Sequence, residues 1–252
     1  MPEGPVRKRR TENRVSSRIV VAKRFNGPPH SAHGGYICGL IAGATGANVR
    51  VRLFHPPPLE TEFEVVARPP DEWRVTQGKD TIATAVRTEV RVHVPPAPTY
   101  VQAMDASLHF AGFKREVFSD CFVCGRQRQR GDGLRIFPGS IPGGIVYAAP
   151  WLPSDDVTDA NGKVKPEFIW SVLDCPGYYS SFSDLRPALL GEFTVQIDRL
   201  VHADEGCVII GWPILVEGRK HKVGTALFDE DGERCALGIA TWVETKVDPP
   251  PP

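Results

Sequence analysis

Hydrophobic and polar residues alternate along most of the chain in short runs that are typical of β-strands. Alternation with a period of two places the apolar residues on one face of a strand, so the runs predict an antiparallel sheet with one covered face. The stretch 34–47 differs, because it is almost wholly apolar and predicts a helix. The predicted strands of the first half are 18–25, 48–54, 61–68, 72–77 and 81–94.

The second half repeats this order of elements. A strand is predicted at 144–151, and an apolar helix follows at 166–174 with Pro166 in its first turn, a position that suits proline. Asp231-Gly232 predicts a tight hairpin between the last two strands. Each half therefore reads as a strand, a helix and four strands, so one helix can cover one apolar sheet face. The remaining predicted strands are 191–201, 206–216, 220–230 and 232–244.

This repetition predicts an α+β fold with two tandem units. Three prolines at positions 95, 96 and 98 mark the end of the first unit, and a polar connector follows them. The expected divisions are a basic arm at 1–14, a first unit at 15–98, a connector at 99–120, a second unit at 121–246 and a proline tail at 247–252.

Composition excludes several classes of partner. Among 252 residues, 30 basic and 30 acidic side chains cancel, so no net field attracts nucleic acid or an anionic membrane. The basic cluster 7–10 is expected to be a solvated terminus rather than a nucleic-acid arm. No apolar run approaches the roughly 20 residues that span a bilayer, and no signal-peptide core follows the basic start. We therefore expect a cytoplasmic protein without membrane or nucleic-acid partners.

The six cysteines are scattered, mostly in apolar runs, which predicts buried free thiols in a reducing compartment. Cys121 and Cys124 have the spacing of metal ligands, but a structural zinc site usually requires two such pairs. The chain has no second pair, so no metal site is expected. Cys38 and Cys175 lack a clear histidine partner and are expected to be inert rather than nucleophilic.

Two motifs resemble those of a known family. The His33-Gly34-Gly35 opening of the first helix is similar to that of the central helix in phenylacetic-acid-type acyl-CoA thioesterases. The segment 121–136, "CFVCGRQRQRGDGLRI", resembles one that introduces domains of that family. With the strand order, this resemblance covers about residues 15–246 and implies two tandem hotdog units, each a long antiparallel sheet around one helix. It also implies an acyl-thioester substrate and no cofactor beyond the coenzyme A of that substrate.

The resemblance implies a composite site. The first amides of a helix lack partners and can bind a developing oxyanion, and glycine allows a carbonyl to approach closely. In the resembled thioesterases a carboxylate lies nine residues after the histidine, and some share one site between two subunits. The first unit has Gly34 and Gly35 but places Ala42 at the carboxylate position, whereas the second unit has Asp174 there and Pro166-Glu167 in place of the glycines. We therefore expect Gly34 to face Asp174, while the mirror site is inactive.

Several assignments stay open at this level. Asp174 could instead be a structural residue at a helix end, because Pro176 follows. His33 could polarise the site or bind a backbone carbonyl. The small residues of the first helix could leave a groove for an acyl chain or allow close packing. Weaker candidates for substrate binding are Asn26, Tyr36, Thr194, Arg219 and Lys220, the last two for coenzyme A phosphates.

The expected function is hydrolysis of an acyl-CoA or related acyl thioester, with Asp174 as general base or as nucleophile. One alternative is a hotdog protein that binds acyl-CoA without turnover, which the missing acid at Ala42 favours. A second alternative is an enoyl-thioester hydratase, for which His33 is the one candidate histidine. Fused hotdog pairs often associate further, so a homo-oligomer is also consistent with the sequence.

Overall fold

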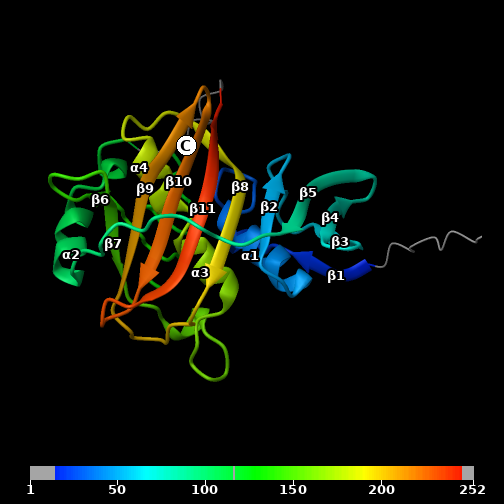
Figure 1. The fold of residues 1–252 in the computed structure, drawn as a ribbon, viewed down its shortest axis with the longest axis horizontal. Helices are drawn as coiled ribbons and strands as arrows, with labels where there is room; N and C mark the ends of the chain where they lie inside the picture. The colour runs from blue at the N-terminus through cyan, green and yellow to red at the C-terminus, as the bar shows by residue number, and fades with distance from the viewer. Residues whose placement is uncertain (1–14, 116, 246–252) are drawn as a thin grey trace, which may run out of the picture.

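A computed structural model describes residues 15–115 and 117–245. The predicted basic arm and proline tail lie outside these residues. The described chain forms one eleven-stranded sheet in the order β1-β3-β4-β5-β2-β8-β11-β10-β9-β7-β6 (Figure 1). The strands are β1 (Val15–Val20), β2 (Val49–Leu53), β3 (Glu62–Arg68), β4 (Glu72–Gln77), β5 (Asp80–Arg87), β6 (Gly139–Ser140), β7 (Tyr147–Trp151), β8 (Ala188–Ile197), β9 (Cys207–Glu217), β10 (Lys220–Phe228) and β11 (Arg234–Glu244).

The two halves of the sheet have the same topology. The first runs β1-β3-β4-β5-β2, and the second runs β7-β9-β10-β11-β8, so each half places its second strand at the inner edge. These edges join where β2 pairs with β8 in antiparallel register, with Val51 opposite Phe193. The helices α1 (Gly34–Thr45), α3 (Pro166–Val172) and α4 (Cys175–Ser181) lie against this sheet. The predicted α+β architecture, with an antiparallel sheet and covering helices, is confirmed.

The two central helices, α1 and α3, pack directly against each other. A Cβ atom added to Gly35 would lie 2.6 Å from the carbonyl oxygen of Trp170, and one added to Gly39 would lie 2.6 Å from Cα of Glu167. Real Cβ atoms do not approach so closely, so glycine is needed at both positions. Of the two roles considered for the small residues of the first helix, the structure shows close helix–helix contact at these glycines.

Several predicted elements differ from the observed ones at their ends. The predicted strand 18–25 ends at Val20, and a 3₁₀ turn (Lys23–Phe25) follows it. α1 ends at Thr45 because Gly46 takes a left-handed conformation (φ 64°) that closes the helix. The predicted helix 166–174 stops at Val172, and α4 begins at Cys175 with Pro176 in its first turn. The break between the two helices contains Asp174.

The predicted strand 81–94 ends at Arg87, because the chain then leaves the sheet and crosses its outer face. In Figure 1 this segment runs in front of β8, β11, β10 and β9 toward α2 (Tyr100–Leu108). Val90 lies in a separate apolar cluster with Trp212 and Phe228 of the outer face. Alternating valines at 90, 92 and 94 thus pack on a sheet without pairing as a strand, which explains the strand-like pattern. The expected polar connector contains α2 and a 3₁₀ turn (Ala111–Phe113).

Candidate functional site

The start of α1 presents backbone amides toward the second half of the molecule. His33 is the N-cap, and its Nδ1 accepts a hydrogen bond from the Tyr36 amide at 3.3 Å. The Gly34 amide has no hydrogen-bond partner among the described residues. A Cβ atom at Gly34 would lie 2.7 Å from Cδ2 of Leu190 and 3.3 Å from Oδ2 of Asp174, so a larger residue would fill this space.

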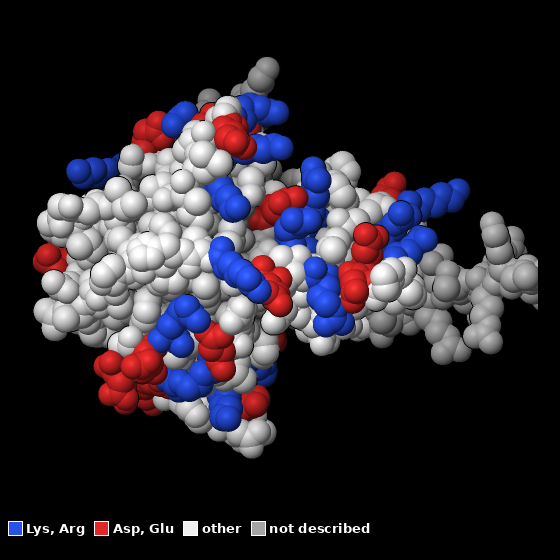
Figure 2. Space-filling model, in the orientation of Figure 1, with Lys and Arg blue, Asp and Glu red and all other residues white. Residues whose placement is uncertain are grey.

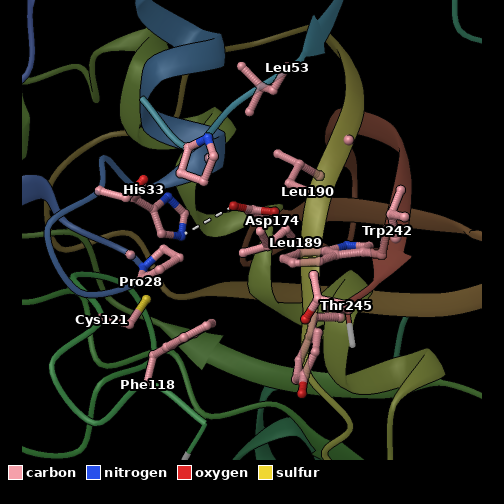
Figure 3. A pocket seen from close by; sticks show the side chains of 18 of the residues that line it. Pro28, His33, Leu53, Phe118, Cys121, Asp174, Leu189, Leu190, Trp242 and Thr245 are labelled. Atoms are coloured by element: carbon pink, nitrogen blue, oxygen red, sulfur yellow. Dashed lines mark ion pairs between the residues drawn. The ribbon is translucent and has the colours of Figure 1, made fainter. Parts of the chain in front are cut away.

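Asp174 reaches this helix start from the break between α3 and α4. Its Oδ2 accepts a hydrogen bond from the Gly35 amide at 2.8 Å and lies 3.3 Å from Nε2 of His33 (Figure 3). Its Oδ1 is buried and has no hydrogen-bond partner. The carboxylate caps no amide of its own helix, so the observed contacts cross to the other half of the chain. The structure therefore brings together His33, Gly34, Gly35 and Asp174, as the sequence predicted.

The charges of this pair are set by burial and by mutual attraction. Burial raises the pKa of Asp174 to about 6, although the nearby His33 and the Gly35 amide oppose the rise. Burial lowers the pKa of His33, but Asp174 and Cys121 together outweigh it, and the net pKa of His33 is raised. Because Nδ1 accepts from Tyr36, the proton of neutral His33 resides on Nε2, facing Asp174.

A cavity of about 310 Å³ opens beside these groups. His33, Gly34 and Asp174 line one part of it, and the rest of its wall is mostly apolar. Figure 3 shows the side chains of the apolar part around the carboxylate. A small apolar chamber with a few convergent polar groups is the usual form of a small-molecule site. The apolar residues shown are Pro28, Leu53, Phe118, Leu189, Leu190 and Trp242.

Three cysteines also gather at this cavity, which the sequence analysis did not foresee. Cys121, Cys124 and Cys175 all line it, and Sγ of Cys175 lies 3.5 Å from Nε2 of His33. The Cys124 and Cys175 thiols donate toward Cys121 and hold its pKa well below the usual value. All six cysteines are buried and free, as predicted. The sequence signals were the C-x-x-C spacing of Cys121 and Cys124 and the position of Cys175 directly after Asp174.

The weaker candidates for substrate binding lie partly at the cavity and partly outside it. Arg219 lines the cavity, whereas Lys220 lies outside it, in a shallower hollow beyond β8. Asn26, Tyr36 and Thr194 do not line the cavity. The side-chain nitrogen of Asn26 donates to the backbone carbonyl of Asp120 at 3.0 Å, and its side-chain oxygen accepts from the Arg128 guanidinium. Tyr36 stacks on Phe25 with ring centroids 4.2 Å apart, and Thr194 is buried within β8.

The corresponding place at the start of α3 lacks both functional groups. Pro166 occupies the first helical position, so no backbone N–H is available there, and Lys165 provides no side-chain cap. The residue of α1 at the position that matches Asp174 is Ala42. This end of the helix pair therefore lacks the first helical amide that corresponds to Gly34 and the carboxylate that corresponds to Asp174.

The surface provides no single-sign patch on the face in Figure 2, where basic and acidic side chains are interspersed. Within the described ranges, no helix is long and apolar enough to cross a membrane.

Solved structures of other proteins share this architecture. No family model and no curated protein matches the sequence. The TesB protein of Mycobacterium avium subsp. paratuberculosis superposes with a TM-score of 0.59 and 12% identity, covering 90% of this chain and 92% of that one. The fold is the double hotdog. A Lactobacillus plantarum protein assigned as an oleoyl thioesterase gives a TM-score of 0.55 at 9% identity, covering 92% of this double hotdog and 96% of that chain.

Proposed function

We propose that this double hotdog hydrolyses acyl thioesters, acyl-CoA in the first place, at one composite site. The observation that carries the proposal is the pairing of two complementary groups across the halves. Oδ1 of Asp174 is buried without a partner beside a cavity, and the free amide of Gly34 lies at the same wall. A buried polar atom without a partner is rare in proteins and is typical of a functional position.

In the proposed reaction the thioester carbonyl oxygen accepts a hydrogen bond from the Gly34 amide. This amide lies at the positive end of α1, so it stabilises the negative charge that develops on the oxygen. Oδ1 of Asp174 then takes a proton from water, whose oxygen bonds to the carbonyl carbon, or it attacks that carbon directly. On the water route the C–S bond then breaks and the leaving thiolate takes the proton from Asp174. On the direct route no proton has been transferred, so the C–S bond breaks and coenzyme A leaves as the thiolate. In the direct route, water afterwards hydrolyses the acyl-aspartyl intermediate.

The other groups position the carboxylate. The Gly35 amide donates to Oδ2 and Nε2 of His33 lies 3.3 Å from the same oxygen, whereas Oδ1 has no partner. The raised pKa of Asp174 suits a general base, since proton transfer is most effective when this pKa lies near the operating pH. The apolar wall would take the acyl group, and Arg219 at the cavity would pair with a phosphate of coenzyme A.

The test is a panel of acyl-CoA substrates of different chain lengths, with release of free coenzyme A followed by a thiol reagent. The wild type is compared with Asp174→Asn and with Asp184→Asn, a control on an exposed carboxylate. Loss of a general base is expected to reduce kcat by about 100- to 10,000-fold. Turnover that is equal in the wild type and Asp174→Asn would contradict the assigned role of this residue.

The His33–Asp174 contact favours a second candidate, the hydration of an enoyl thioester. That reaction uses a histidine–carboxylate pair to add water across a carbon–carbon double bond, and the structure provides such a pair at 3.3 Å. The two activities give different products from crotonyl-CoA. Hydrolysis releases a thiol, whereas hydration removes the ultraviolet absorbance of the enoyl group and releases no thiol.

A further inference from the structure

Four potential metal ligands converge on one wall of the cavity. Cys121 and Cys124 come from the loop before β6, Cys175 begins α4, and His33 caps α1. Within the described residues, His33, Cys121 and Cys175 form the one histidine, cysteine or carboxylate group whose ligand atoms lie within 4.8 Å of one another. Cys124 lines the same cavity and comes from the same loop as Cys121, which makes it the candidate for a fourth ligand.

The spacing of these atoms matches tetrahedral coordination. With Zn–S bonds of about 2.3 Å and Zn–N bonds of about 2.0 Å, a tetrahedral ion separates two sulfurs by about 3.8 Å and a sulfur from a nitrogen by about 3.5 Å. The observed distances are 4.0 Å between Sγ of Cys121 and Cys175, and 3.5 Å between Sγ of Cys175 and Nε2 of His33. The ligand atoms of His33, Cys121 and Cys175 are therefore already placed near three corners of a tetrahedral metal site.

The loop that carries Cys121 and Cys124 is built as a tight turn. The Gly125 amide donates to the carbonyl of Cys121 at 2.8 Å, and a Cβ atom at Gly125 would lie 2.4 Å from that oxygen. Only glycine fits this turn, which directs both thiols to the same side. The Phe122 amide binds the carbonyl of Asn26 at 2.8 Å and fixes the loop beside α1.

We propose that Cys121, Cys124, Cys175 and His33 bind one thiophilic divalent metal ion, with zinc as the principal candidate. Three thiolates and one imidazole form a common structural zinc set. The ion would tie together three segments that are distant in sequence. All four residues line the cavity, which provides a route for the ion from solvent. This site goes beyond the proposed hydrolysis and does not depend on it.

Metal binding has a defined consequence for His33. Nε2 must lose its proton to bind the ion, so Nδ1 takes a proton and can no longer accept from the Tyr36 amide. The present Nδ1–amide distance of 3.3 Å is long for such a bond, so this cap is easily given up. Tyr179, whose hydroxyl lies 3.9 Å from Sγ of Cys124, would remain as a donor to that sulfur.

The experiment uses the full-length protein, reduced and freed of metal by a chelator that is then removed. Cobalt(II) alone is titrated first, and zinc is then added. One equivalent of cobalt is expected to give a thiolate-to-metal charge-transfer band and the visible bands of a tetrahedral ion, which zinc abolishes. Cys124→Ser and Cys175→Ser are each expected to weaken binding by at least about tenfold. The control, Cys207→Ser, removes a buried cysteine outside the cluster and is expected to bind as the wild type does.

A wild-type measurement covers the case in which a variant does not fold. X-ray absorption of the zinc-loaded protein is expected to show three sulfur ligands and one nitrogen ligand. The proposal is overturned if folded, reduced wild type gives no cobalt bands, if binding is unchanged in both variants, or if absorption shows only oxygen and nitrogen ligands. Because no readout measures turnover, failure of the proposed hydrolysis leaves this test intact.

Discussion

Replacing Asp174 with Asn is expected to raise the stability of the fold while it removes activity. The carboxylate is 2% exposed, and burial raises its pKa from 3.8 to about 6. An acid whose pKa is higher in the folded state loses stability as pH rises through the window between these two values. A rise from 3.8 to about 6 corresponds to about 3 kcal/mol once the group is fully ionised. Asn has nearly the same shape and carries no charge, so it avoids this cost.

The assay is chemical denaturation of the wild type and Asp174→Asn at pH 4 and pH 7. A chelator is present throughout, so that no metal binds the neighbouring thiols. The difference in unfolding free energy, variant minus wild type, is expected to grow by about 2 kcal/mol from pH 4 to pH 7, because part of the effect is already present at pH 4. In Asp184→Asn, which changes an exposed carboxylate, this difference should remain nearly constant. A difference for Asp174→Asn that stays flat or falls with pH would refute the claim that folding destabilises the ionised carboxylate.

Three further changes test other parts of the structure. Gly35→Ala places a Cβ atom 2.6 Å from the Trp170 carbonyl, so α1 and α3 must separate; we expect a loss of about 1–3 kcal/mol in denaturant unfolding and reduced turnover. Arg128→Ala removes a buried guanidinium that holds the loop before the cysteines, and we expect a loss of about 2 kcal/mol by the same measurement. Burial acts against ionisation of Asp229, but bonds from Arg199 and two backbone amides lower its pKa overall, so its stabilisation is present above about pH 4 and lost below it. Asp229→Asn should therefore lose about 1–2 kcal/mol at pH 7, with a difference from wild type that shrinks in acid.

Each of these three has a matched control and a contradicting outcome. Gly43→Ala adds a Cβ atom with nothing within 4 Å, so it should leave the stability unchanged or improve it. An equal change in stability in Gly35→Ala and Gly43→Ala would contradict the role assigned to the contact between Gly35 and Trp170. Arg130→Ala, on the exposed side of the same loop, should unfold as the wild type does. A pH-independent effect of Asp229→Asn would show that its charge is not involved.

The strand pattern predicted the architecture where a strand buries alternate residues on one face, as β2 does, whereas long runs of β9, β10 and β11 are buried without alternation. It failed where the alternation had another cause, as at 88–99, where valines pack on the outer sheet face without pairing. The placement of Gly34 opposite Asp174 could be inferred from the sequence, because each half has the group that the other half lacks. The backbone amide that donates a hydrogen bond to Asp174 is, however, that of Gly35. The thiol cluster could not be inferred, because its members come from three segments and only folding brings His33 and Cys175 to Cys121 and Cys124.

The contact between α1 and α3 also bears on how the protein is made. A nascent chain completes β1 through β5 while the glycine face of α1 has no partner, since α3 is translated more than one hundred residues later. The first half is therefore synthesised with the α3-binding face of α1 exposed. The interface between α1 and α3 forms only after the second half has been synthesised.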